Sequence, residues 1–186
     1  MNATTHALFG VAALAGLSLS TGVEPPLYAY PAAAVSAWVP DVDNPRSRLG
    51  NGLSHRKNPL LNAAIRPLSW ALRTLSFVLV RAVGHRTLTH SFLGVAIFAV
   101  LVSPLAPLVP GLYGALLAGY VSHLVADALN TPGVPLLWPL RWRFRLLPGG
   151  LRSGGAAEFV VAIAVAAAAV YGVYELHPAL SGALSF

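Results

Sequence analysis

Residues 156–176, AAEFVVAIAVAAAAVYGVYEL, form a long apolar run near the C-terminal end of the sequence. Within this run only Glu158 and Glu175 carry a charge, and each lies within one turn of an end. A helix of about 20 apolar residues is long enough to cross the hydrocarbon core of a bilayer, which is roughly 30 Å thick. The run therefore predicts a membrane-spanning helix in an integral membrane protein.

The composition of the whole chain supports the same class. Of 186 residues, 56% are hydrophobic and 10% are charged, and the mean hydropathy is +0.67. Such values are typical of helical membrane proteins and not of soluble domains. We predict an all-α bundle that forms one membrane domain, 1–186, with membrane segments at about 4–21, 27–39, 91–109, 112–129 and 156–176.

Two of these segments allow a second interpretation. Segment 4–21 resembles the apolar part of a signal peptide, but no positively charged region precedes it, so we expect it to be retained as a helix. Segment 27–39 is short and contains Pro31. It either crosses obliquely or packs inside the bundle, because irregular backbone cannot face lipid.

A further apolar stretch, residues 60–83, has the pattern of an interfacial amphipathic helix. Arg66, Arg73 and Arg81 follow one another at spacings of seven and eight, which places them near one helical face. Pro67 and the central Arg73 disfavour the alternative, a membrane-spanning helix with snorkelling arginines. The polar residues before this stretch are rich in turn formers and predict a loop.

The distribution of charge predicts the orientation of the chain. All twelve Lys and Arg residues lie in two stretches, 40–90 and 130–155, on the same side of the predicted topology. The positive-inside rule assigns this side to the cytoplasm. Topology and contacts with lipid headgroups account for the net charge of +6 and the pI of about 10.3. We therefore expect membrane lipids, and no nucleic acid, as partners.

Most of the His, Asp and Glu residues gather at the depth of this cytoplasmic interface. Only His55, His177, Glu24 and Glu175 lie elsewhere. A random scatter of polar residues would not produce this pattern, so we predict one shared polar pocket. Its candidate metal ligands, from separate places in the sequence, are His6, Asp41, Asp43, His85, His90, His123, Asp127 and Glu158.

The strongest pair in this set is His123 and Asp127, which are four residues apart in HLVAD. On a helix they share a face and could bind one metal ion, or they could form a hydrogen-bonded pair between helices. His85 and His90 are five residues apart and converge only if the chain turns between them. Arg86, beside the start of the next helix, favours an anion such as phosphate at that place.

The other candidates are weaker when each is taken singly. Asp41 and Asp43 in PDVDNP could point at one hard cation, but aspartate is also common in turns of this kind. His6 could bind a metal ion or lie among headgroups. Their predicted position at the same membrane depth as the pair in HLVAD supports a role as metal ligands.

Five motifs follow one another between residues 5 and 158: THALFG, PDVDNP, HRTLTHS, HLVADALNTPGVPLLWP and RSGGAAE. In this order and spacing they resemble the YdjM-like bacterial inner-membrane proteins, which are classed as membrane-bound metal-dependent hydrolases. The resemblance implies an inner-membrane location, a hydrolytic activity and motif roles for the eight candidate residues. Thr87 departs from the small residue that the family commonly has after the arginine of its H-R-x-x-T-H motif.

The candidate residues also limit the chemistry. Because the chain has no cysteine, a metal site must use imidazole and carboxylate ligands, which suit Zn²⁺ and also Mn²⁺ or Fe²⁺. The set exceeds the needs of one ion and has room for two, and an ion pair suits phosphoester hydrolysis by metal-activated water. We expect Asp127 or Asp43 to act as the general base and Arg86 to stabilise charge that develops on the substrate.

Two other functions stay open at this point. A metal-ion transporter usually carries its ligands near the middle of the bilayer, whereas these residues gather at one interface. A non-catalytic metal-binding membrane protein would need only four ligands and no open coordination position. We therefore favour a membrane-embedded hydrolase that acts at the cytoplasmic interface on a phosphoester or lipid-like ester.

Overall fold

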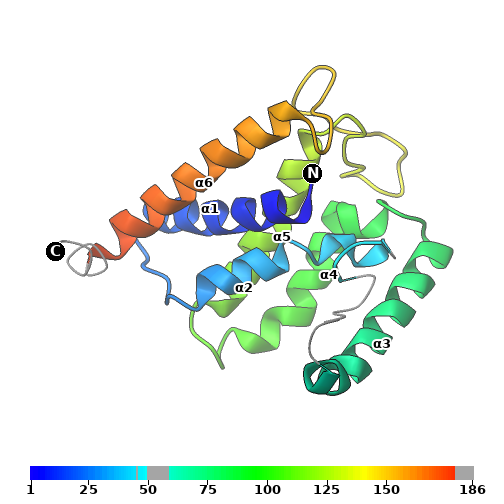
Figure 1. Ribbon diagram of the computed structural model, residues 1–186, viewed down its shortest axis with the longest axis horizontal. Coiled ribbons are helices and arrows are strands. Elements are labelled where there is room, and N and C mark those ends of the chain that lie inside the picture. Colours follow the sequence, from blue (N-terminus) through cyan, green and yellow to red (C-terminus); the bar gives the residue numbers. More distant parts are fainter. Residues whose placement is uncertain (45, 50–58, 179–186) are drawn as a thin grey trace.

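The computed structural model describes residues 1–44, 46–49 and 59–178, and these residues are mostly helical (Figure 1). Within the described ranges, pairing of the β type is limited to two isolated bridges, Asn130 with Leu151 and Val134 with Phe144. The predicted all-α fold is confirmed. In chain order the elements are α1 (Ala3–Thr21), α2 (Ala29–Ser36), η1 (Pro40–Asp43), α3 (Pro59–Ala82), η2 (Leu88–His90), α4 (Phe92–Val102), η3 (Ser103–Leu105), α5 (Leu112–Ala128) and α6 (Ala156–Leu176).

Helices α1 and α6 pack against each other and begin at the same end of the bundle. The side chain of Asn2 caps α1 by accepting a hydrogen bond from the backbone N–H of Thr5 at 2.9 Å. Glu158, in the first turn of α6, accepts one from the backbone N–H of Asn2 at 2.6 Å. With 19 and 21 residues, both helices are long and apolar enough to cross a membrane.

Helix α2 lies in a narrow space between α1 and α5 because two glycines line that space. Gly10 of α1 and Gly119 of α5 both face the carbonyl oxygen of Ala33, which is fully buried. A Cβ atom at Gly10 would lie 2.5 Å from that oxygen, and one at Gly119 would lie 2.2 Å from it. Small residues at such contacts let membrane helices approach closely, so α2 is held between its neighbours by backbone-to-backbone packing.

The bundle has two ends with different chemistry. The contact between Asn2 and Glu158 marks one of them, here termed the polar end. At the opposite, distal end the hydroxyl of Tyr28 donates to the carbonyl of Pro110 at 2.5 Å. Three more residues meet there and are termed the distal clasp: Glu24, Tyr30 and His177.

The helices alternate in direction between these ends, but two of them are short. Helices α2 and α4 have 8 and 11 residues, which correspond to about 12 and 17 Å at 1.5 Å per residue. The apolar helix that begins at Phe92 extends through η3 as far as Leu105. The predicted count of five membrane segments is therefore not confirmed, although all five segments contain helix.

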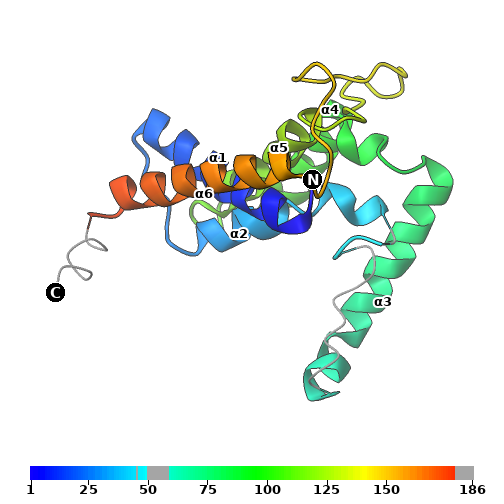
Figure 2. The same cartoon turned by 45° about the horizontal axis from the view of Figure 1, so that its top comes forward.

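Helix α3 stands apart from α1, α5 and α6 in both views (Figures 1 and 2). It packs on η1 at the polar end. Its observed bounds, Pro59–Ala82, are each one residue from the predicted bounds. By length and composition alone, Leu61–Ala82 also qualifies as a membrane-spanning helix. The centre of the predicted loop before α3, residues 50–58 with His55, lies outside the described residues.

The connection from α5 to α6 folds back on the end of α5. The backbone N–H groups of Leu146 and Leu151 donate to the carbonyls of Ala128 and Leu129, at 2.8 and 2.7 Å. These bonds satisfy carbonyl groups that the end of a helix leaves without partners. They also fix Asn130 directly beside the last turn of α5.

Candidate metal centre

Five of the predicted residues converge at the polar end, and they come from four elements. His6 lies in α1, Asp41 in η1, His90 in η2, and His123 and Asp127 in α5. Together they are termed the polar cluster. Four of the side chains are buried, and that of Asp41 is 23% exposed. The elements thus bring residues that are far apart in the sequence to one buried place.

Two imidazoles and one carboxylate form the centre of the polar cluster. The Nε2 atoms of His90 and His123 lie 3.2 Å apart. Asp127 Oδ2 lies 3.7 Å from His90 Nε2 and 3.8 Å from His123 Nε2. Because His123 and Asp127 are four residues apart on one helix, they present their side chains on the same face.

The Nε2 atoms of His90 and His123 form one triangle with Asp127 Oδ2. They form a second triangle with Asp41. Its Oδ1 atom lies 3.6 Å from His90 Nε2 and 3.9 Å from His123 Nε2. Ligand atoms about 2.1 Å from a tetrahedral ion lie about 3.4 Å from one another. The distances within the two triangles are close to this spacing, so a small contraction would bring the three atoms of either triangle to ligand distance.

His6 closes the cluster on the side of α1. Its ring stacks on the ring of His123, with centroids 3.9 Å apart and planes 14° apart. His6 Nε2 lies 3.5 Å from Asp127 Oδ1, yet neither ring nitrogen of His6 has a hydrogen-bond partner. At least one of these nitrogens carries a lone pair, because a neutral imidazole has only one N–H.

Hydrogen bonds from the surroundings fix how the other two imidazoles are protonated. His123 Nδ1 lies 2.7 Å from the carbonyl oxygen of Ala37, so Nδ1 carries the proton and donates it. Thr89 donates its hydroxyl proton to Asp43 at 2.8 Å, so its oxygen accepts from His90 Nδ1 at 3.0 Å. In both rings the lone pair is left on Nε2, which faces the cluster. Contacts of this kind typically orient histidine ligands.

The ionisation of Asp41 fits the same arrangement. Burial raises the pKa of the Asp41 carboxyl, and a second proton on His90 or His123 would lower it by more. The carboxylate is ionised at neutral pH, which is the form that binds a cation.

The donor set of the polar cluster fits a divalent cation. Among the described residues, neither buried ring nitrogen of His6 has a hydrogen-bond partner, which is rare for polar atoms unless a ligand satisfies them. Imidazole and carboxylate together suit Zn²⁺, Mn²⁺ or Fe²⁺. Two sets of residues place their ligand atoms within 4.8 Å of one another: His6, His123 and Asp127, and Asp41, His90 and His123.

Comparisons with known proteins place this site in a family. The sequence matches the family described as YdjM inner membrane protein over residues 1–183. The chain belongs to this family. It is 36% identical over 159 residues to the Inner membrane protein YdjM of Escherichia coli (strain K12), a match that covers 78% of this chain and 69% of that protein. The protein of the same name from Shigella flexneri gives the same values.

A third relative covers almost the full length. The chain is 31% identical over 176 residues to the Uncharacterized protein YvsG of Bacillus subtilis (strain 168), which covers 95% of this chain and 96% of that protein. No solved structure matches the chain. The resemblance that the sequence motifs indicated is confirmed at the level of the family.

Asp43, which was predicted as a ligand and as a general base, lies outside both sets of ligand atoms in this YdjM-family protein. It is fully buried, and its carboxylate contacts three groups of the HRTLTHS loop. Oδ1 lies 2.9 Å from His85 Nδ1, and Oδ2 accepts from the backbone N–H of Arg86 and from the Thr89 hydroxyl, both at 2.8 Å. The geometry gives Asp43 the role of holding this loop against η1.

Arg86 occupies the mouth of the polar cluster. Its backbone has a φ of 53°, a left-handed conformation that is uncommon outside glycine. The hydrogen bond from its N–H to Asp43 holds the backbone in this state. Its Nη2 atom lies 2.6 Å from Asp127 Oδ2, and its side chain is 20% exposed. Strained backbone of this kind is concentrated at functional sites.

Two other predicted ligands also lie outside the sets of ligand atoms that converge. His85 binds Asp43, is partly exposed, and has its ring centroid 6.2 Å from that of His90. Glu158 accepts from the hydroxyl of Thr5 at 2.8 Å and from the backbone N–H of Gly154 at 2.6 Å, in addition to Asn2. Glu158 thus ties the start of α1 to the start of α6 and positions His6 one turn further on.

Some residues of the site were missed by the sequence analysis. Asn130 is fully buried and donates from Nδ2 to Asp127 Oδ1 at 2.8 Å. Thr89 links Asp43 to His90, and the carbonyl of Ala37 orients His123. The position of Asn130, three residues after Asp127 in a recognised motif, could have indicated its role. The role of the Ala37 carbonyl could not be predicted, because every residue has a backbone carbonyl and the sequence does not mark the one that contacts His123.

Proposed function

We propose that this YdjM-family protein is a membrane-embedded, metal-dependent hydrolase that cleaves a lipid-like phosphoester at the cytoplasmic interface. The observation that carries the proposal is the convergence of three imidazoles and two carboxylates around one buried space, with an arginine at its mouth. The three histidines direct ring nitrogens toward this space and leave it rich in lone pairs. Such a set of groups is typical of metal centres in hydrolases.

Zn²⁺ is the ion that we favour, with Mn²⁺ and Fe²⁺ as alternatives. Asp41, His90 and His123 would hold one ion, and His6 with Asp127 lies where a second could bind. When bound, the metal would supply a Lewis acid for an ester oxygen and would make water a stronger acid. The roles of Arg86, Asp127 and Asp43 are inferred from their contacts within the protein.

Arg86 is the group that would meet the charge of the substrate. Its guanidinium is partly exposed and is bound to Asp127. A phosphate oxygen at the mouth would compete with that carboxylate for the same N–H donors, because arginine binds both kinds of anion through its planar fork. When the phosphate replaces the Asp127 carboxylate on Arg86, the positive charge of the guanidinium would lie beside the phosphoryl group that is transferred.

Of the two carboxylates considered as general base, Asp127 fits the role better than Asp43. Asp127 faces the polar cluster with Oδ2, close to both His90 and His123 and beside Arg86 at the mouth. Both oxygens of Asp43 are already engaged with the HRTLTHS loop. We therefore assign proton acceptance to Asp127, and we assign to Asp43 the positioning of Arg86 and, through Thr89, of His90.

The cytoplasmic location of the site rests on the basic residues of 40–90 and 130–155, since both stretches join the helices at the polar end. The chain lacks cysteine, so single introduced cysteines can report sidedness. Trp142, in the α5–α6 connection, and Val23, at the distal end, are 69% and 65% exposed. In intact cells a membrane-impermeant thiol reagent should label Val23→Cys and not Trp142→Cys. The reverse pattern would contradict the cytoplasmic site.

The enzymatic proposal is tested by metal analysis of the purified protein together with hydrolysis assays on phospholipids and soluble phosphoesters. We expect bound Zn²⁺ and turnover that stops when a chelator removes the metal and returns when metal is restored. A protein that is fully loaded with metal but hydrolyses none of these esters, and that passes metal ions across liposomes, would be a transporter and not a hydrolase.

A further inference from the structure

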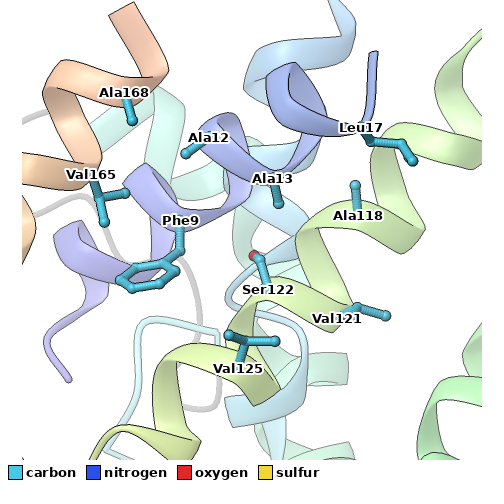
Figure 3. A pocket seen from close by; sticks show the side chains of 10 residues that line it. All are labelled: Phe9, Ala12, Ala13, Leu17, Ala118, Val121, Ser122, Val125, Val165 and Ala168. Atoms are coloured by element: carbon cyan, nitrogen blue, oxygen red, sulfur yellow. The ribbon is translucent and has the colours of Figure 1, made fainter. Parts of the chain in front are cut away.

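A long apolar groove runs along α1 on the side away from α2. Helix α1 packs on both α5 and α6, which stand apart from each other here, so that α1 forms the floor and the other two form the walls (Figure 3). Ala12 and Ala13 of α1, Ala118 of α5 and Ala168 of α6 line it. Because these side chains are small, they leave a volume of about 440 Å³, which is within the range of roughly 300–1,000 Å³ for small-molecule sites.

The lining of this groove is suited to hydrocarbon. Among the described residues that line it, Ser122 has the only polar side chain, and its hydroxyl already donates to the carbonyl of Gly119 at 2.7 Å. The other described lining residues offer a ligand no charged or hydrogen-bonding side chain. A ligand would gain stability here through burial of apolar surface alone.

One end of the groove adjoins the polar cluster. Phe9 lies three residues after His6, which is about one turn of α1, and Ser122 directly precedes His123 on α5. Phe9 and Val125 lie together at the same end of the groove (Figure 3). From Phe9 the groove follows α1 as far as Leu17, a rise of about 12 Å at 1.5 Å per residue.

The apolar lining of the groove and its position next to the polar cluster favour a hydrocarbon chain attached to a phosphoester over a helix of another protein. An extended alkyl chain is much thinner than a helix and has no polar groups to satisfy.

We propose that this groove binds an acyl chain of the lipid substrate, with the phosphoester at the polar cluster and Arg86. The assignment rests on the proposed function for the position of the headgroup. It adds a chain-binding site made by α1, α5 and α6, which makes the enzyme selective for phosphoesters that carry a long hydrocarbon chain.

The test compares Ala168→Phe, which fills the groove from the exposed wall of α6, with Ala167→Phe on the same helix. Ala167 is exposed and does not line the groove. Ala13→Leu, on the floor, is a second groove variant in case the first alters folding. Each protein is purified in detergent, checked for metal content, and exposed to phosphatidic acid that carries a photoreactive diazirine in one acyl chain.

In the wild type and in Ala167→Phe, we expect the diazirine to label peptides of α1, α5 and α6 that line the groove. In the two groove variants the labelling should fall about ten-fold, which corresponds to excluding roughly two methylene groups from apolar contact. Turnover of a long-chain phosphoester should fall by a similar factor, while a short soluble phosphoester such as p-nitrophenyl phosphate should react at the wild-type rate.

The outcomes separate this inference from the proposed function. Unchanged labelling in both groove variants, or an equal effect on long and short substrates, would overturn the acyl-chain site and leave the hydrolase standing. Groove-specific labelling without hydrolysis of any ester would support the chain site and remove the hydrolase. A dimer cross-linked through the groove residues would assign the groove to a second copy of the chain and overturn the inference.

Discussion

At both ends of the bundle a buried histidine lies beside a carboxylate, but the ring nitrogens of the histidines make different contacts at the two ends. In the distal clasp, His177 Nδ1 lies 2.8 Å from Glu24 Oε1 and Nε2 lies 3.2 Å from the hydroxyl of Tyr30. Both ring nitrogens therefore have a partner. In the polar cluster, His90 and His123 direct Nε2 at each other and His6 has no hydrogen-bond partner at all.

The difference shows how a structural histidine is told from a candidate ligand. Burial does not separate the two ends, since His177 is 8% exposed and His6 is 1% exposed. The count of hydrogen-bond partners separates His6 from His177: among the described residues neither ring nitrogen of His6 has a partner, whereas both ring nitrogens of His177 have one. A cation could bind the ring nitrogens of the polar cluster, whereas both ring nitrogens in the distal clasp already have partners.

Removing a ligand of the polar cluster should produce the largest contrast. His123→Ala and Asp127→Ala should each lower metal affinity by more than roughly 100-fold, since even residues that only orient ligands contribute 10–100-fold. His177→Ala is the matched control, because it removes a buried histidine from the other end. Metal analysis of the three purified variants measures the effect. Equal metal content in all three would show that the two ends do not differ in this way.

Arg86 should affect catalysis more than metal binding. Arg86→Ala removes a cation that touches Asp127 without removing a ligand. We expect kcat to fall by roughly 10²–10³, as for the loss of one oxyanion partner, with metal content close to that of the wild type. Arg81→Ala, in α3, serves as a control for loss of positive charge. Wild-type turnover in Arg86→Ala would remove Arg86 from the catalytic site.

Asn130 should have a smaller effect on metal affinity. Asn130→Ala removes the amide that donates to Asp127 Oδ1 and leaves that oxygen free to turn. We expect metal affinity to fall by roughly 10–100-fold, measured by competition with a chromogenic chelator. Thr131→Ala, at the next position, should leave it unchanged because that hydroxyl donates to Leu151 and not to the cluster.

The smallest effect is expected at the distal clasp. His177→Ala breaks the contacts with Glu24 and Tyr30, which should lower the free energy of unfolding by about 1–2 kcal/mol. For a chain of this size that corresponds to a fall in Tm of roughly 2–8 °C. The shift should be the same with and without metal. A shift that appears only in the metal-loaded protein would mean that the two ends are coupled.

Apolar runs predicted the long helices well. Helix α6 has the predicted bounds, and α1 and α5 differ from theirs by a single residue at one end. Within the predicted membrane segment 91–109, α4 ends at Val102 and is followed by the 3-10 helix η3, which contains Ser103 and Pro104. The short segment 27–39 became α2 followed by η1, which begins at Pro40, and its packing depends on Gly10 and Gly119.

The sequence predicted which residues gather at the candidate site, but it did not predict how they contact one another. A shared membrane depth brought together the five residues of the polar cluster along with Asp43, His85 and Glu158. The actual roles depend on backbone groups, such as the N–H of Arg86 that engages Asp43 and the N–H of Asn2 that engages Glu158. Sequence periodicity reveals side-chain faces, but it does not show which backbone group a loop will present.

The placement of His6 and Asp127 sets an order for biosynthesis. His6 enters the membrane with the first helix, whereas Asp127 is added only after about two thirds of the chain has been synthesised. The space between them cannot exist until α5 has inserted and docked on α1. Metal capture by the proposed centre would therefore be a late event of assembly, and a protein stalled before α5 would expose His6 without a complete site. The supply of metal to that centre would then act on the last stage of folding and not on insertion itself.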